Sequence, residues 1–138
     1  MQVYYFSRTG RSKEIATKIA NSLNQNSNEI KDTENWQGLK GFIKGGAKAS
    51  IKDTVDISYA KPDRNDEFIL VFPIWAGTFP PAVRSFLNEI NCNEKVTLIP
   101  TSLMTKLKKR DEFKKVIDLV GKDIMSKSVD EILKWQVL

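Results

Sequence analysis

Apolar residues follow two spacings along the chain, and each spacing predicts a different kind of element. Short runs of β-branched and aromatic residues predict strands, and apolar positions that recur every three or four residues predict helices. The predicted strands are 3–6, 29–31, 68–72, 96–99 and 124–126. The predicted helices are 13–23, 36–51, 80–91, 111–121 and 130–136, the second of them weakened by its glycines.

The alternation of strands and amphipathic helices predicts how the elements pack. It is typical of a parallel sheet with helices on both faces, an α/β sandwich of three layers. A five-stranded doubly wound sheet of order 2-1-3-4-5 fits a single domain over residues 1–138. In that order ligands bind beyond the carboxyl ends of the first and third strands, so the loops 7–12 and 73–79 should form one site.

The composition restricts the chemistry that such a site can perform. Hydrophobic residues make up 41% and charged residues 28%, which is a globular balance, but histidine is absent and Cys92 is the single cysteine. These counts exclude Ser-His-Asp and Cys-His catalysis and an internal disulfide, and we identify no metal site and no catalytic residue. We expect a cytoplasmic protein without a membrane span, whose chemistry comes from backbone groups, hydroxyls, cations or a bound cofactor.

The net charge is +5, and the densest basic stretch lies at 106–115. Such a stretch could attract nucleic acid, an acidic protein or an anionic cofactor. Asp111 and Glu112 interrupt it, and Phe113 is its one aromatic residue. The pattern therefore favours a solvated loop and helix face, and nucleic acid is not the expected partner.

The loop after the first strand has the features of a phosphate-binding site. Ser7-Arg8-Thr9-Gly10-Arg11-Ser12 places hydroxyl side chains at alternate positions directly before a helix, whose first N–H groups lack partners and attract anions. Gly10 allows the backbone to approach a ligand closely. The loop lacks GxxxxGK[ST] and GxGxxG, so a nucleotide triphosphatase or a dinucleotide-binding fold is disfavoured. The alternative is an ordinary Ser/Thr-rich helix cap.

The same six residues match [ST]-x-T-G-x-[ST], the phosphate signature of the flavodoxin family. Their context, YYFSRTGRSKEIA, resembles the short flavodoxin-like proteins, and the glycine-rich stretch 41–46 and the loop 73–81 are similar to theirs. The resemblance extends over the order of elements along nearly the whole chain and is most specific within 1–91. It implies the flavodoxin-like fold and noncovalently bound FMN.

The resemblance also implies which residues hold that cofactor. The phosphate would lie in the loop 7–12 and the isoalloxazine ring over the loop that contains Trp75, with backbone groups of 76–78 at the ring edge. The candidate cofactor-binding residues are Ser7, Arg8, Thr9, Gly10, Arg11, Ser12, Pro73, Ile74, Trp75, Ala76, Gly77, Thr78, Ser102 and Leu103. Trp75 would stack on the ring; the alternative is a partly buried aromatic residue of the loop.

Two features differ from the family pattern. The loop 100–105 lacks the glycine and the tyrosine that family members often carry there, so Leu103 or Met104 would either cover the ring or simply pack in the loop. Electron-carrying flavodoxins are typically acidic, whereas this chain is basic, with Arg8 and Arg11 beside the predicted phosphate. Because cations favour an anionic reduced flavin, we expect a less negative reduction potential than in acidic relatives.

The resemblance implies an FMN-binding electron-transfer protein that docks to a redox partner protein or a small-molecule acceptor. Two other functions stay open. One is an FMN-dependent NAD(P)H:quinone-type reductase, although the chain has little spare length for a nicotinamide site. The other is a noncatalytic domain of the same fold that has lost flavin and binds an anionic partner through the basic stretch.

Overall fold

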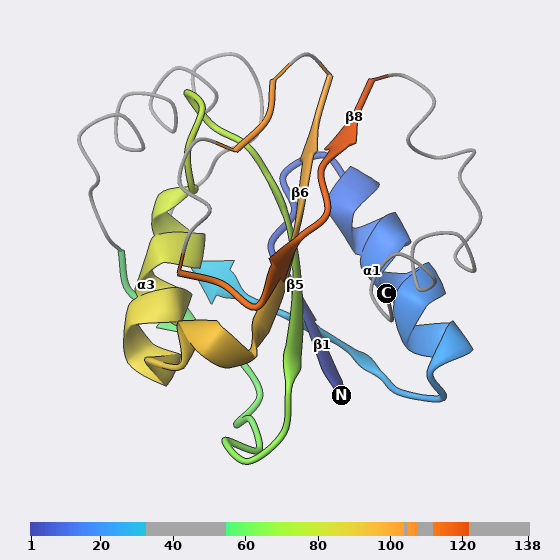
Figure 1. The fold of residues 1–138 in the computed structure, drawn as a ribbon, viewed down its shortest axis with the longest axis vertical. Helices are drawn as coiled ribbons and strands as arrows, with labels where there is room; N and C mark the ends of the chain where they lie inside the picture. The colour runs from blue at the N-terminus through green and yellow to red at the C-terminus, as the bar shows by residue number, and fades with distance from the viewer. Residues whose placement is uncertain (33–54, 104, 108–111, 122–138) are drawn as a thin grey trace.

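The computed structural model describes residues 1–32, 55–103, 105–107 and 112–121. The elements predicted at 36–51, 124–126 and 130–136 lie outside these residues, and so does Met104. The described chain forms a central sheet with one helix on each side, α1 (Arg11–Ser22) and α3 (Pro81–Ile90), as Figure 1 shows. A short 3₁₀ turn, Asn93–Lys95, follows α3.

The central sheet is parallel throughout. Its strands are β1 (Gln2–Tyr5), β2 (Ser27–Glu29), β5 (Phe68–Pro73), β6 (Val96–Ser102), β7 (Lys115–Val116) and β8 (Leu119–Val120). Their order is β2-β1-β5-β6-β7, and β8 also pairs with β6. This is the predicted order for the first four strands. The fifth position is occupied by β7 and β8 from a segment that was predicted as a helix, and the strand predicted at 124–126 lies outside the described residues. The doubly wound three-layer prediction is therefore confirmed.

The sheet lies between the two helices because its inner strands are apolar on both faces. All five residues 68–72 are buried, and alternate side chains of a strand point to opposite faces. Phe68, Leu70 and Phe72 pack with α3, in a core that includes Phe86 and Ile90. Ile69 and Val71 pack on the other face with α1, in a core that includes Ile15 and Ile19. The apolar sides of α1 and α3 thus cover the two faces of β5, the predicted third strand.

The prediction of a helix over 111–121 was wrong for the residues that the structure describes. Here the chain forms β7 and β8, whose main chain pairs with the open edge of β6: the Ile117 N–H donates to Leu98 O at 2.8 Å and the Gly121 N–H to Ser102 O at 2.9 Å. Val116, Ile117 and Val120 fit a strand as well as a helix, because β-branched residues favour extended backbone. Gly121, expected to end a helix, instead follows the last residue of β8 and has φ 106°.

The segment predicted as a strand at 29–31 is divided between two sheets. β2 begins earlier, at Ser27, and β3 (Lys31–Asp32) pairs antiparallel with β4 (Ile57–Ser58) in a separate ladder. The main chain just before β4 is held to α3, because Ser85 Oγ accepts from the Val55 N–H at 3.0 Å and donates to Val55 O at 2.7 Å. This contact fixes the ladder against the sheet face that α3 covers.

Candidate functional site

A pocket of about 340 Å³ opens where β1, β5 and β6 end. It lies at the point where the winding of the sheet reverses, and its size falls within the roughly 300–1,000 Å³ of small-molecule sites. It is lined by Ser7, Arg8, Thr9, Arg11, Ser12, Pro73, Ile74, Trp75, Thr101, Ser102 and Leu103. The two loops that the sequence assigned to one site therefore do meet in the structure.

The loop 7–12 presents the N-terminus of α1 to this pocket. Gly10 is the N-cap with φ 97°, its N–H donates to Ser7 Oγ at 2.9 Å, and no side chain caps the helix. The first backbone hydrogen bond of the helix runs from the Glu14 N–H to Gly10 O, at 3.0 Å. The amides of 11–13 precede that bond, so this end of the helix offers an anion N–H groups and the positive end of the helix dipole.

Two buried hydroxyl groups form the floor of the pocket beside that helix end. Ser12 is 2% exposed and Thr101, on β6, is 3% exposed. Ser12 Oγ lies 3.2 Å from Thr101 Oγ1, which also donates to Phe72 O at 3.3 Å. Thr101 is not among the site residues predicted from the sequence. Its position beside the predicted Ser102 was the only available signal, because its role depends on strand pairing.

The loop after β5 forms the opposite wall through a tight turn. Trp75 and Thr78 exchange both backbone hydrogen bonds at 3.0 Å, and the two residues between them have positive φ, 52° at Ala76 and 77° at Gly77. These angles are those of a type I′ two-residue turn. The indole of Trp75 is 4% exposed and packs edge-to-face on Phe6, with ring centroids 5.6 Å apart. Trp75 therefore lines the pocket and also belongs to the hydrophobic core.

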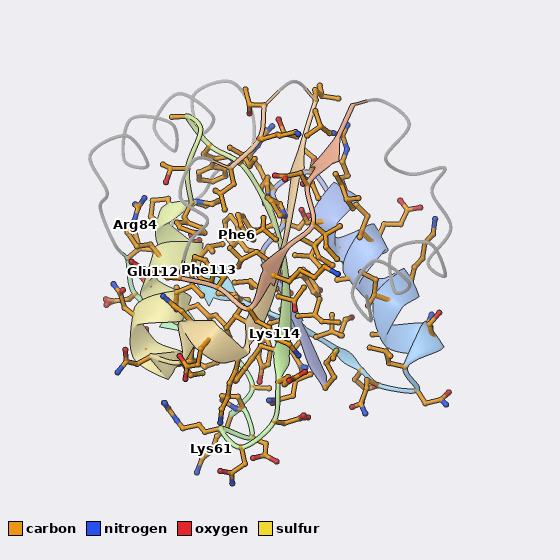
Figure 2. The ribbon with its side chains drawn as sticks, viewed as in Figure 1. Phe6, Lys61, Arg84, Glu112, Phe113 and Lys114 are labelled. Atoms are coloured by element: carbon orange, nitrogen blue, oxygen red, sulfur yellow. The ribbon has the colours of Figure 1, made fainter. Side chains whose placement is uncertain are left out.

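The structure brings most of the predicted site residues to the pocket. Gly10, Ala76, Gly77 and Thr78 are not among the residues that line it. Thr78 instead lines a second hollow of about 220 Å³ beside α3, where Arg84 Nη2 donates to Thr78 Oγ1 at 3.4 Å. Figure 2 shows Arg84 near Phe113, which lines the same hollow. The turn 75–78 therefore separates two cavities.

The rim of the main pocket is apolar on the β6 side. Leu103 is 53% exposed and is the one large apolar residue that is exposed within the described part of the chain. It follows β6 immediately, so it lies at the pocket mouth above Ser102. An apolar ligand surface that contacted Leu103 would remove this side chain from water, which is favourable.

The charge of the pocket is positive. Arg8 and Arg11 are both half-buried and line it, and none of the described residues that line it is acidic. Arg8 belongs to the loop before α1 and Arg11 is the first residue of that helix. Anions are therefore attracted to this end of the pocket by two side chains and by the helix dipole.

The basic stretch has a different setting from the one expected. Lys108, Lys109 and Arg110 lie outside the described residues, while Lys114 and Lys115 belong to the edge of the sheet rather than to a helix face. Lys114, labelled in Figure 2, forms an ion pair with Glu67, and its N–H donates to Val96 O at 3.0 Å. The charge of Lys114 is thus partly neutralised within the fold.

Comparison with known proteins agrees with this architecture. No family model matches the sequence, and no curated protein matches it. Among solved structures, the chain is similar to a flavoprotein from Lactobacillus acidophilus NCFM in complex with FMN, with a TM-score of 0.66, 19% identity and coverage of 98% of this chain and 97% of that one. It is also similar to a candidate flavoprotein from Bacteroides eggerthii DSM 20697, with a TM-score of 0.73, 18% identity and coverage of 99% and 94%.

A third similar structure, a candidate flavoprotein from Bacteroides uniformis ATCC 8492, has a TM-score of 0.60 and 19% identity over 96% of both chains. At these identities the likeness concerns the fold. The chain thus has the flavodoxin-like fold, as its sequence motifs implied. Within the described residues, no helix has the length and hydrophobicity needed to span a bilayer.

Proposed function

We propose that this chain binds FMN in the main pocket and acts in the cytoplasm as an electron-transfer protein toward a redox partner protein or a small-molecule acceptor. The observation that carries the proposal is the pocket itself, which joins an uncapped helix N-terminus and two arginines to an apolar wall at the switch point of the sheet. The FMN complex of a protein with a similar fold supports it.

The phosphate end of the pocket fits a phosphate monoester. Ser7 Oγ already accepts from the Gly10 N–H, so its own hydrogen is available for a phosphate oxygen. The amides of 11–13 and the side chains of Arg8 and Arg11 add further donors, and charge-assisted bonds of this kind are roughly twice as strong as neutral ones. We therefore assign the phosphate of FMN to the loop 7–12.

The remainder of the pocket fits a planar apolar ring. Pro73, Ile74 and Trp75 form one wall and Leu103 stands at the opposite rim. The bound flavin would supply the redox chemistry, while the chain supplies its placement and its electrostatic surroundings. The indole of Trp75 is largely covered by the protein, so we assign it to the edge of the ring site, with Leu103 as the residue that covers the other side.

The cations beside the phosphate should influence the reduction potential of bound flavin. Arg8 and Arg11 favour any added negative charge, so the potential should be less negative than in acidic flavodoxins. Spectroelectrochemical titration of the FMN-loaded chain and of its Arg11→Gln variant tests this. The variant should have the more negative potential, and an equal or less negative one would contradict the electrostatic argument.

The first experiment is a titration of the purified chain with FMN and with riboflavin, followed by flavin fluorescence and calorimetry. We expect FMN to bind in a 1:1 ratio and more tightly than riboflavin, because riboflavin lacks the phosphate. Ser7→Ala should weaken FMN binding, whereas Thr17→Val, on α1 but outside the pocket, should leave it unchanged. Absence of FMN binding, or equal affinity for both flavins, would overturn the proposal.

A second experiment separates electron transfer from NAD(P)H-dependent reduction. The FMN-loaded chain is mixed anaerobically with NADH or NADPH and, in parallel, with dithionite, while flavin absorbance is recorded. We expect dithionite to bleach the flavin and the nicotinamides to leave it oxidised. Rapid bleaching by NADPH, with turnover when a quinone is added, would show a reductase instead.

A further inference from the structure

The two buried hydroxyl groups on the pocket floor come from distant parts of the chain. Ser12 belongs to the first turn of α1 and Thr101 to β6, and they are separated by 89 residues in sequence. Their oxygens are 3.2 Å apart, and Thr101 Oγ1 is 3.3 Å from Phe72 O on the neighbouring strand. Both side chains line the pocket and both are almost fully buried. Phe72 O, Thr101 and Ser12 therefore form a short hydrogen-bonded chain that ends at the pocket.

The direction of this chain follows from counting hydrogens. A hydroxyl group has one hydrogen and two lone pairs, and a carbonyl oxygen only accepts. Thr101 therefore donates to Phe72 O, and the bond between the two hydroxyls must use the hydrogen of Ser12. In this arrangement Ser12 directs lone pairs, rather than a hydrogen, toward the pocket.

A phosphate requires the opposite arrangement. Its oxygens are acceptors, so Ser12 can contact them favourably only by turning its hydrogen to the pocket. Ser12 then loses its bond to Thr101, unless Thr101 turns its own hydrogen from Phe72 O to Ser12 Oγ. One neutral hydrogen bond within the protein is thereby exchanged for a charge-assisted bond to the ligand, which is the stronger of the two.

We propose, on the basis of the proposed function, that the Ser12–Thr101 hydroxyl pair reverses its hydrogen-bond direction when phosphate binds, so that Thr101 and the FMN phosphate compete for the hydrogen of Ser12. Thr101 acts through Ser12, which stays hydrogen-bonded with and without the ligand. This matters because a buried hydroxyl without a partner costs about 1–3 kcal/mol. Riboflavin has no phosphate, so its binding leaves the pair in its original direction.

The test replaces the hydroxyl of Thr101 while it retains the shape of the side chain. Thr101→Val removes the donor, Thr101→Ser retains it, and Thr97→Val is the matched control. Thr97 is also buried and lies on the same face of β6, but it is outside the pocket. The dissociation constants of FMN and of riboflavin are measured for each variant, and circular dichroism and urea unfolding establish that each is folded.

We expect Thr101→Val to strengthen FMN binding about fivefold, because Ser12 then has no bond to Thr101 to give up when it turns to the phosphate, and to change riboflavin binding by less than about twofold, because riboflavin leaves that bond in place. Thr101→Ser should bind FMN within about threefold of the wild-type chain, and Thr97→Val should bind both flavins as the wild type does. If Thr101→Val does not fold, Thr101→Ala takes its place with the same expectations.

A double-mutant cycle with Ser12→Ala tests whether Thr101 acts through Ser12. Once Ser12 has lost its hydroxyl, Thr101→Val should change FMN binding by less than about twofold, so the two effects should be strongly non-additive. Additive effects would contradict the relay, and so would FMN binding by Thr101→Val that is equal to or weaker than that of the wild type. Equal weakening of FMN and riboflavin would show a packing role instead.

These outcomes are distinct from failure of the proposed function. A wild-type chain that binds neither flavin overturns both the function and the relay. A wild-type chain that prefers FMN, together with an equal or smaller preference in Thr101→Val, overturns only the relay.

Discussion

Replacement of Trp75 by alanine tests whether this residue is part of the core or mainly a surface for the cofactor. The indole is 4% exposed and packs edge-to-face on Phe6. A buried aromatic side chain removes roughly 150–250 Å² from water, worth about 4–6 kcal/mol at about 25 cal/mol per Å². Residual burial in the unfolded chain lowers this to about 3–5 kcal/mol, the usual range for Trp→Ala. We therefore expect the flavin-free chain to lose about 4 kcal/mol of stability.

The assay is urea unfolding of the flavin-free proteins, followed by far-UV circular dichroism so that loss of the indole does not change the signal. Leu103→Ala is the matched control, because Leu103 lines the same pocket but is 53% exposed. That variant should change the free energy of unfolding by less than about 0.5 kcal/mol. Trp75→Phe retains an aromatic ring and should lie between the two, which leaves a folded protein for flavin titration.

A loss of less than about 1 kcal/mol in the free energy of unfolding of Trp75→Ala would refute the argument, since truncation of a fully packed tryptophan costs about 3–5 kcal/mol. Trp75 would then be exposed in the free chain and would serve the cofactor alone. A loss of about 4 kcal/mol together with unchanged FMN affinity in Trp75→Phe would make it a core residue that shapes the pocket wall.

Three further predictions concern other parts of the fold. Ala76→Gly should increase the free energy of unfolding by up to about 1 kcal/mol, and so raise the urea midpoint, because alanine is strained at φ 52°. A lower midpoint would contradict this. Ser85→Ala should cost about 1–3 kcal/mol in the same assay, because it leaves the Val55 N–H and C=O without their partner, and an unchanged midpoint would show that water replaces the hydroxyl. Burial, with a hydrogen bond to Glu89, raises the pKa of Tyr59 to about 12. The contribution of Tyr59 to folding stability should therefore be complete below pH 10 and should decline as the pH rises toward 12. Glu89→Gln should lower this pKa in a phenolate absorbance titration, and an unshifted titration would exclude Glu89 as a cause.

Much of the architecture was predictable from sequence because its signals are local. The run 68–72 is apolar without alternation, which requires that both faces be covered, and the structure buries all five residues. The stripe that contains Ile15 and Ile19 shows a helix by its period alone. The hydroxyls and glycine of 7–12, placed between a strand and a helix, likewise indicated an anion site without any knowledge of the tertiary contacts.

Other features were decided only when the chain had folded. The edge of β6 offers unpaired backbone groups, and the segment 115–120 pairs with them as strands although its apolar spacing also fits a helix. Thr101 became part of the pocket because strand register brings it to Ser12, which is 89 residues away. The burial of Trp75 depends on its contact with Phe6 from another strand end. The sequence alone determined the local periods and placed the hydroxyls and glycine of the loop 7–12 between a strand and a helix. Backbone pairing and packing between distant segments decided the edge strand, the pocket floor and the burial of the indole, because these depend on contacts that no local pattern contains.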